Sequence, residues 1–304
     1  MEVIVAIDGG GSRTRCLVVD RAGRVVGEGT SGPSNHLLID RNTVTHSLES
    51  AVEAALANAG LERKRVVCVS AGLAGVDYDG CGAEEMKRLF VGLGFQNPVV
   101  NGDMVIAHAG ALGTRSGVVA LSGTGSCVLG IGSNGERVKV GGWGPIYGDE
   151  GSAYRIGALS LRAAARAYDR RGPETALVQS LTRALGAKDF QETAARVYTD
   201  DMSPREIAAL CRVAYQTAEA GDEVAREIFV QAAGELVESV NVALRLLDLS
   251  KKVVSYQGAV LESCHLLRQQ FVDQLQQNDR VVVTPPKSEP VIGAYLLGRK
   301  ALNW

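Results

Sequence analysis

The sequence predicts an α/β protein in which one strand-rich unit occurs twice. Two observations predict this fold. A run of three short apolar strands appears near the N-terminus and again after residue 117, and in both runs a glycine-rich turn follows the first strand. Helical patterns and further strands follow each run. With 304 residues, of which 46% are hydrophobic and 22% charged, the chain has enough apolar material for roughly two domains.

The first half of the chain is expected to have the order β-β-β-α-β-α-β, followed by a short helix. The expected strands are Val3–Ile7, Cys16–Val19, Arg24–Gly27, Val66–Val69 and Val99–Val100. The expected helices are Asn42–Ala59, Ala83–Leu93 and Met104–Leu112. Apolar residues recur at helical spacing in the first of these, at Val44, Leu48 and Val52, and Gly94 ends the second.

The second half repeats the three strands and is then dominated by helices. The expected strands are Val118–Leu121, Cys127–Ile131, Val138–Val140, Val253–Tyr256 and Val281–Val283. The expected helices are Ser152–Arg170, Pro173–Leu185, Pro204–Ala220, Asp222–Leu247, Leu261–Gln276 and Val291–Ala301. A glycine-bearing loop at 111–117 joins the halves and could act as a hinge.

Charge and cysteine usage favour a cytoplasmic protein without nucleic-acid or membrane partners. The formal net charge is −2, so no basic field attracts a phosphate backbone. No apolar run approaches the roughly 18 residues of a membrane span, and the N-terminus lacks a basic leader. The 6 cysteines are scattered without a C-x-x-C pair, which favours reduced, mostly buried thiols.

A first glycine-rich turn follows the first expected strand. Gly9, Gly10 and Gly11 lie between Asp8 and the run Ser12-Arg13-Thr14. Consecutive glycines expose backbone N–H groups that can wrap a phosphate chain, and a carboxylate such as Asp8 can hold Mg²⁺. A tight hairpin without a ligand would use glycines in the same way. A strand follows and no Gly-Lys-Ser/Thr is present, so neither a Walker A loop nor a dinucleotide fingerprint fits.

A second turn of the same design opens the second half. Its sequence is Ser122-Gly123-Thr124-Gly125-Ser126, again between two expected strands. Either turn alone could be an ordinary hairpin. Two such turns at equivalent positions of a repeated unit could contact one phosphate chain from both sides, and the pair is therefore more specific than either turn.

With a third glycine-rich stretch, these turns resemble a known superfamily. The stretch is Gly141-Gly142-Trp143-Gly144-Pro145-Ile146-Tyr147-Gly148-Asp149-Glu150-Gly151-Ser152. Together with Asp8–Thr14 and Leu121–Ser126, it resembles the actin-like ATPases, which include the hexokinases. Within that superfamily it resembles the family named after BadF, BadG, BcrA and BcrD, especially its N-acetylglucosamine kinases.

The resemblance runs along nearly the whole chain and implies two ribonuclease H-like domains with a cleft between them. The expected domains are residues 1–112, completed by a C-terminal helix at 290–304, and residues 113–289. It also implies an ATP-dependent kinase, with Mg²⁺ as cofactor, that phosphorylates the 6-hydroxyl of an amino sugar. N-acetylglucosamine is the first expectation, and glucosamine and N-acetylmuramic acid stay open. A homodimer is implied by the resemblance alone.

Asp103, in Asn101-Gly102-Asp103, is the expected catalytic base. It follows a short expected strand and precedes a helix. The resembled kinases have a carboxylate here that accepts the proton of the attacking hydroxyl. Aspartate before a helix is also a favoured N-cap, and the two roles are compatible.

The resemblance assigns the other ligand contacts to loops. The expected sugar contacts are Asn35, Gly75, Thr124, Gly142, Trp143 and Asp149. The expected ATP contacts are Gly9, Gly10, Gly11, Ser12, Arg13, Thr14, Gly123, Thr124, Gly125, Gly258 and Ala259, and Asp8 is the expected metal ligand. Outside this family pattern, Trp143 would be expected in a core or turn and Asp149 on an exposed loop. Ala74 replaces a serine of mammalian relatives, and Ala259 replaces a commoner glycine.

Two other function classes stay open. One is an ATPase that activates an acyl-CoA dehydratase or reductase, as in other members of the broad family. Such activators hold an iron–sulfur cluster with a cysteine just before the second glycine turn, where this chain has Val119-Ala120-Leu121-Ser122. The other is a non-catalytic sugar sensor, although no helix-turn-helix domain precedes the first strand.

Overall fold

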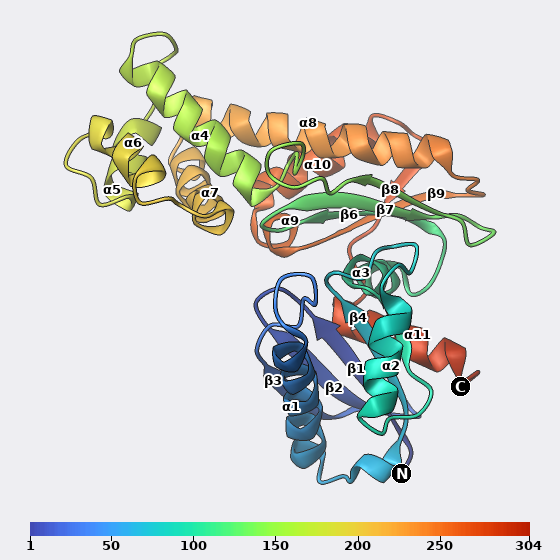
Figure 1. Ribbon diagram of the computed structural model, residues 1–304. Helices are drawn as coiled ribbons and strands as arrows, with labels where there is room; N and C mark the ends of the chain where they lie inside the picture. The colour runs from blue at the N-terminus through green and yellow to red at the C-terminus, as the bar shows by residue number, and fades with distance from the viewer. The chain divides into compact units, whose positions relative to one another are not determined.

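The computed structural model describes residues 1–304 and contains two compact units. Unit 1 consists of Met1–Ser116 and Pro285–Trp304, and unit 2 consists of Gly117–Thr284 (Figure 1). The domain boundaries expected from the sequence lie after residues 112 and 289, whereas the boundaries between the two units lie after Ser116 and Thr284. None of the helices has the length and apolar character needed to cross a membrane.

Unit 1 is built on a five-stranded mixed sheet with the order β3-β2-β1-β4-β5. The strands are β1 (Val3–Gly9), β2 (Thr14–Asp20), β3 (Val25–Ser31), β4 (Val66–Leu73) and β5 (Val99–Gly102). The first three form an antiparallel meander, whereas β4 and β5 run parallel to β1. The carboxyl ends of β1, β4 and β5 therefore meet at one edge of the sheet.

Helices cover both faces of this sheet. They are α1 (Arg41–Ala59), α2 (Ala83–Gly92), α3 (Asp103–Leu112) and α11 (Pro290–Ala301), with a short 3₁₀ turn at Arg63–Arg65. Val3, Val5 and Ile7 of β1 pack in a core with α1 and α2. The intervening Ile4 and Ala6 pack in a second core with α11, as the alternation of side chains along a strand requires.

Unit 2 repeats the same sheet. Its strands are β6 (Gly117–Ser122), β7 (Ser126–Ile131), β8 (Arg137–Gly141), β9 (Lys252–Gln257) and β10 (Val281–Val283). The order is β10-β9-β6-β7-β8, with an antiparallel β6-β7-β8 meander and parallel β9 and β10. Read from β8, it is the order of unit 1, which confirms the predicted α/β class with two ribonuclease H-like sheets.

Seven helices complete unit 2. They are α4 (Ala153–Tyr168), α5 (Leu177–Ala184), α6 (Phe190–Tyr198), α7 (Pro204–Glu219), α8 (Glu223–Leu246), α9 (Ala259–Ser263) and α10 (His265–Gln276). The long helix α8 packs on β6, β7 and β8 and lies along the sheet in Figure 1. Its apolar face, including Phe229 and Leu236, is buried in a core that reaches α4, α7 and α10.

Two helix predictions were wrong in detail, and one helix was missed. The helix expected from Pro173 begins at Leu177, because the carboxylate of Asp222 bonds the hydroxyl of Thr175 and the amide of Ala176. The single helix expected at 261–276 is two helices, interrupted by the extended backbone of Cys264. Helix α6 was not predicted, although Asp189 caps it by accepting a hydrogen bond from the amide of Glu192.

Helices α3 and α11 approach each other closely at two glycines. A Cβ atom on Gly293 of α11 would lie 1.9 Å from the carbonyl oxygen of Ile106, and one on Gly110 of α3 would lie 2.6 Å from the carbonyl oxygen of Glu289. Such distances are far inside van der Waals contact, so only glycine fits at this crossing.

We predict that Gly293→Ala lowers the free energy of unfolding by about 2 kcal/mol or more, because the two helix backbones must separate. The matched control is Gly92→Ala in α2, where an added Cβ would meet nothing within 4 Å. There the change should stay within about 0.5 kcal/mol, since alanine has the better helix propensity. Urea unfolding of the two variants measures the difference, and equal stabilities would contradict the close-packed crossing.

Candidate functional site

The first group of expected site residues lies where β1, β4 and β5 end. In the parallel register, Asp8 of β1 pairs with Gly72 of β4, and Gly72 pairs with Asn101 of β5. Asp103 follows two residues later as the first residue of α3. An added Cβ on Gly72 would lie 2.3 Å from the side chain of Ile106, so a glycine is needed beneath α3.

Asp103 is close enough to Asp8 to affect the ionisation of Asp8. Burial, and next to it the negative charge of Asp103, raise the pKa of Asp8 to about 6, while Arg13 and Arg15 oppose this shift. A carboxyl group with such a pKa favours a nearby cation or proton. The edge of the unit 1 sheet is therefore an acidic site that a bound cation would stabilise.

Asp103 is not the N-cap of α3. Gly102 occupies the N-cap position and makes no side-chain cap bond. Asp103 is the first helical residue, and its Oδ1 accepts a hydrogen bond of 2.8 Å from the amide of Met104. The positive end of the helix favours a carboxylate there and orients it. Asp103 therefore does not have the N-cap role that the sequence left open. Its carboxylate is instead held in the first turn of α3.

The first glycine turn is a compact hairpin between β1 and β2. The amide of Gly10 bonds the carbonyl of Arg13 at 2.9 Å, and the carbonyl of Gly10 accepts from the amide of Ser34 at 3.0 Å. Gly9 is buried, and an added Cβ would lie 2.4 Å from Oγ of Ser34. Gly11, Ser12 and Arg13 form the exposed tip, where a phosphate could reach them.

Thr14 has a different position from the rest of this turn. Its side chain is fully buried, and its hydroxyl donates to the carbonyl of Gly32 at 2.8 Å and bonds Oγ of Ser34 at 2.9 Å. These bonds attach the hairpin to the loop after β3. The side chain of Thr14 therefore stabilises the turn from its buried side, and the exposed tip is formed by the residues before it.

Arg15 and Glu289 are neighbours of this site that sequence reasoning missed. Arg15 lies opposite Asp8 in the β1–β2 register, and its guanidinium forms an ion pair with Glu289, the residue before α11. Glu28 lies 3.8 Å from the same guanidinium. The opposition of Arg15 and Asp8 could have been inferred from the hairpin, but Glu289 is too distant in the sequence.

Asn35, His36 and Gly75 form one cluster in unit 1. Asn35 Oδ1 accepts a hydrogen bond of 3.0 Å from the amide of Leu37. Gly75 has a φ of +97°, and an added Cβ would lie 2.8 Å from both Asn35 Oδ1 and His36 Nδ1. His36 Nδ1 is buried without a hydrogen-bond partner, which is unusual for a polar atom. The two loops expected to contact sugar are thus packed together.

The second glycine turn is fixed to the glycine-rich stretch that follows β8. Gly123 and Thr124 accept hydrogen bonds through their carbonyls from the amides of Ala153 and Tyr154, at 2.9 and 3.2 Å. The hydroxyls of Ser122 and Ser126 donate to the carbonyls of Gly151 and Glu150, at 2.9 and 2.7 Å. The turn and the start of α4 therefore form one hydrogen-bonded assembly.

Asp149 lies against this turn and is buried. Only 8% of its surface is exposed, so it is not the exposed loop acid that the sequence would suggest outside the family pattern. Its Oδ1 accepts a hydrogen bond of 3.2 Å from the amide of Ser126, and an added Cβ on Gly125 would lie 2.8 Å from the same carboxylate. Burial raises the pKa of Asp149 above its ordinary value.

Trp143 lies on an exposed loop and not in a core. Its exposed fraction is 72%, and Ile146 and Tyr147 on the same loop are also exposed. Gly142 has a φ of +74°, and an added Cβ would lie 3.0 Å from Cβ of Cys127. The loop thus presents the aromatic rings of Trp143 and Tyr147 to solvent, where their apolar faces are accessible.

The expected adenosine loop packs directly on the second glycine turn. Gly258 has a φ of +104°, and an added Cβ would lie 2.3 Å from the carbonyl oxygen of Ser122. Ala259 is exposed and begins α9. A cavity of about 340 Å³ opens beside it, lined by Ala153, Ala208, Ala209, Cys211, Arg212, Tyr215, Ala259, Val260, Ser263 and Cys264. Sequence reasoning missed the α7 residues of this lining, which carry no recognisable motif.

Comparisons with known proteins show the family of this chain. The family model described as the BadF/BadG/BcrA/BcrD ATPase family matches residues 5–298. A protein of Clostridium acetobutylicum named N-acetylmuramic acid/N-acetylglucosamine kinase is 32% identical over 98% of this chain and 99% of its own length. A Dictyostelium discoideum protein named N-acetyl-D-glucosamine kinase is 28% identical over 99% of this chain and 98% of its own.

A solved structure has the same fold. It is a candidate N-acetylglucosamine kinase from Chromobacterium violaceum, with a TM-score of 0.78, 25% identity and 98% of both chains covered. The family match spans nearly the whole chain and includes both glycine turns, Asp103 and the adenosine loop. This protein therefore belongs to the BadF/BadG/BcrA/BcrD ATPase family.

Proposed function

We propose that this protein is an ATP-dependent kinase that phosphorylates the 6-hydroxyl of an amino sugar. The observation that carries the proposal is the full-length similarity, at 32% identity, to a protein named for kinase activity on N-acetylmuramic acid and N-acetylglucosamine. A third relative, from Vibrio cholerae, is named a glucosamine kinase and is 24% identical over 99% of this chain. All three names specify amino sugars, which supports N-acetylglucosamine first, with N-acetylmuramic acid and glucosamine as the other candidates.

In this proposal Asp103 accepts the proton of the sugar hydroxyl. Phosphoryl transfer requires an oriented carboxylate more than covalent chemistry from the protein. The bond from the Met104 amide orients the Asp103 carboxylate at the start of α3. Asp8 lies near enough to interact with it electrostatically, so the base and the expected metal ligand share one edge of the sheet.

The glycine turns are proposed to bind the phosphates of ATP through backbone amides. In unit 1 the contacts are Gly9, Gly10, Gly11, Ser12, Arg13 and Thr14, with the exposed tip as the main contact and the buried side chain of Thr14 as a support. In unit 2 they are Gly123, Thr124 and Gly125. Gly258 and Ala259 are proposed to contact the adenosine, and the cavity beside Ala259 has a suitable size for an aromatic base.

The sugar is proposed to contact Asn35, Gly75, Thr124, Gly142, Trp143 and Asp149. The clustering of Asn35 and Gly75 supports this, because a buried His36 nitrogen without a partner lies beside them. Asp149 is buried and oriented by the Ser126 amide, as a carboxylate that binds hydroxyls should be. The homodimer and the cytoplasmic location stay predictions.

The residues present are compatible with Mg²⁺. No group of three or more His, Cys, Asp and Glu side chains is placed to hold a metal ion, so a closed protein cage for a metal is not built. Mg²⁺ typically binds to one or two carboxylates, phosphate oxygens and water, which matches Asp8 together with a nucleotide. When bound, the ion would neutralise phosphate charge, and the raised pKa of Asp8 reflects a site that favours a cation.

An amino-sugar panel tests the proposed function. With ATP and Mg²⁺, we expect ADP release with N-acetylglucosamine, N-acetylmuramic acid or glucosamine, and much less with glucose. Coupled detection of ADP and mass spectrometry of the 6-phosphate measure it. No turnover with any sugar would favour the non-catalytic sensor. Absorbance from an iron–sulfur cluster would favour the dehydratase-activator class.

We predict that Asp103→Asn lowers kcat about a hundredfold or more, because it removes the proton acceptor but keeps the shape of the residue. ATP affinity and melting temperature should change little. The control is Asp40→Asn, which alters the N-cap aspartate of α1 in the same unit and should keep near-normal turnover. Steady-state kinetics and nucleotide titration measure both variants, and normal activity of the first would remove Asp103 as the base.

Asp8 should also affect stability in a pH-dependent way. Its pKa is about 6 in the folded protein, against an ordinary value of 3.8, so the folded state binds the proton more tightly than the unfolded chain does. The ionised carboxylate therefore destabilises the protein progressively as the pH rises from about 4 to about 6. Asp8→Asn should raise the free energy of unfolding at pH 7 by on the order of 1–2 kcal/mol, with little effect at pH 4.

Asp20→Asn is a control of opposite sign for this measurement. Hydrogen bonds from Arg24 hold the pKa of Asp20 below its ordinary value, so its ionised form stabilises the protein above the unfolded pKa and this contribution is lost in acid. Chemical unfolding of both variants between pH 4 and pH 7 should show a gain for one and a loss for the other at neutral pH. A loss in both would contradict the electrostatic account of Asp8.

A further inference from the structure

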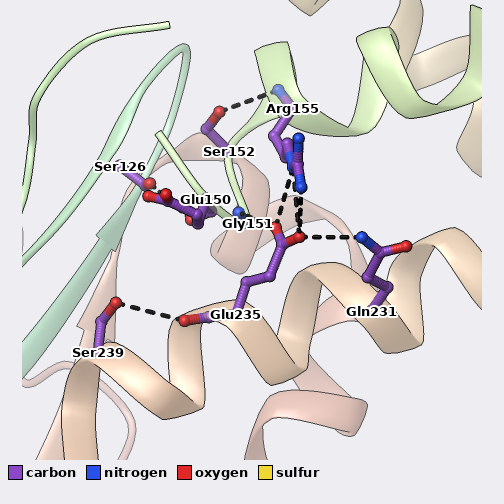
Figure 2. A network of polar contacts seen from close by, with 8 residues as sticks. All are labelled: Ser126, Glu150, Gly151, Ser152, Arg155, Gln231, Glu235 and Ser239. Atoms are coloured by element: carbon purple, nitrogen blue, oxygen red, sulfur yellow. Dashed lines mark hydrogen bonds and ion pairs between the residues drawn. The ribbon is translucent and has the colours of Figure 1, made fainter. Parts of the chain in front are cut away.

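The carboxylate of Glu235 in α8 accepts hydrogen bonds from three different residues. It accepts from the guanidinium of Arg155, with Nη2 at 2.8 Å from Oε1 and Nε at 3.2 Å from Oε2. Oε1 also accepts from the side-chain amide of Gln231 at 3.0 Å, and Oε2 from the backbone amide of Gly151 at 3.2 Å. Figure 2 shows this carboxylate between the three donors. The Glu235 side chain is only 16% exposed.

The contact with Gly151 is tight as well as polar. Gly151 has a φ of +74°, and an added Cβ would lie 2.3 Å from Cγ of Leu236 and 2.6 Å from the carbonyl oxygen of Ala232. The backbone at this residue therefore lies flat on α8, over one turn of the helix. Glu235 is on that turn and bonds the amide that faces it.

Gly151 and Glu150 are also bonded to the serines on either side of Gly123, Thr124 and Gly125, which are proposed to bind phosphate. The carbonyl of Gly151 accepts from Ser122 Oγ, and the carbonyl of Glu150 accepts from Ser126 Oγ, so both ends of the second glycine turn are bonded to this segment. Asp149 precedes it and bonds the Ser126 amide. Arg155 belongs to the same network, because its amide bonds Oγ of Ser152, the N-cap of α4.

We propose that Glu235 is a positioning residue, which holds residues 149–152 and, through them, the second glycine turn in the geometry needed for phosphoryl transfer. The expected effect of Glu235 on turnover rests on the proposed kinase function. The positioning itself is a property of the structure and can be tested without turnover. Small displacements of substrate-binding groups reduce rates strongly, so loss of Glu235 should affect turnover more than folding.

A structural role alone would give a different pattern. Removing one partner of a partly buried ion pair destabilises a protein, whereas replacing both partners by apolar side chains can restore stability. The double change Glu235→Leu with Arg155→Leu should therefore regain stability. It still leaves the Gly151 amide without its acceptor, so the positioning role predicts that activity stays low.

Glu192 of α6 provides a matched control. Its carboxylate accepts from the guanidinium of Arg196 at 3.1 Å and from the backbone amide of Lys188 at 2.8 Å, the same combination of partners in the same unit. Both partners lie in α6 or just before it, and neither belongs to the glycine-rich segments. Glu192→Leu should therefore cost stability but keep turnover within about twofold.

The experiment compares Glu235→Gln, Glu235→Leu, the double variant and Glu192→Leu with the unmodified chain. Glu235→Leu should lower kcat/KM for the amino sugar at least tenfold, and Glu235→Gln should retain more activity, because it keeps an acceptor for Gly151. Hydrogen–deuterium exchange should rise at residues 122–126 and 149–152 in Glu235→Leu and in the double variant. It should stay unchanged there in Glu192→Leu.

The outcomes separate the two proposals. Unchanged exchange at both segments in Glu235→Leu would overturn the positioning role, as would recovery of full kcat/KM in the stabilised double variant. If the unmodified chain phosphorylates no sugar, the proposed function fails, and the exchange data still decide whether Glu235 holds the turn. Increased exchange with low activity in the double variant supports the inference.

Discussion

The parallel register of β1, β4 and β5 is the constraint on which the candidate site of unit 1 depends. Asp8, Gly72 and Asn101 lie in one row across the sheet, so the chain leaves all three strands at the same edge. Two acidic groups, Asp8 and Asp103, are thereby held in a partly buried place where their charges repel. The sheet and helix α3 together hold the two carboxylates close to each other, whereas in a flexible loop their repulsion would move them apart.

Unit 2 places different side chains at the corresponding edge of its sheet. The carboxyl end of β1 in unit 1 corresponds to the carboxyl end of β6, where Ser122 is buried and its hydroxyl bonds the backbone of Gly151. Hydroxyls and glycines occupy this edge, and the carboxylate of Asp149 reaches it from a separate segment. The repeated fold thus supplies one edge with two neighbouring carboxylates, in unit 1, and one edge of hydroxyl and backbone groups joined by a single carboxylate, in unit 2.

Local patterns explain which features could be predicted from the sequence. Both strand triplets, the glycine turns and the position of Asp103 after a strand were recognisable, because alternation and turn residues occur at neighbouring positions. The capping pattern of Asp189 and Glu192 was equally local, and α6 could have been found from it. The family resemblance supplied the ligand contacts that no local pattern indicates.

Contacts between distant positions explain most of what was missed. Arg15 meets Glu289, and Arg155 meets Glu235, across 274 and 80 positions of the chain. The lining of the cavity by α7 likewise depends on how that helix packs beside Ala259. Charged residues at such separations look like ordinary surface residues in the sequence, because only the tertiary fold decides which of them are buried together.

The position of α11 has a consequence for how the chain is made. Unit 2 is continuous in sequence, whereas unit 1 needs residues 285–304, which the ribosome adds only after unit 2. Until then Ile4, Ala6 and Leu17, which pack beside Tyr295 of α11, lack this helix, and only Ile106 of α3 contributes to the core on that face. The nascent protein therefore exposes much of this apolar sheet face until its last residues are added, and chaperones bind exposed apolar surface of this kind.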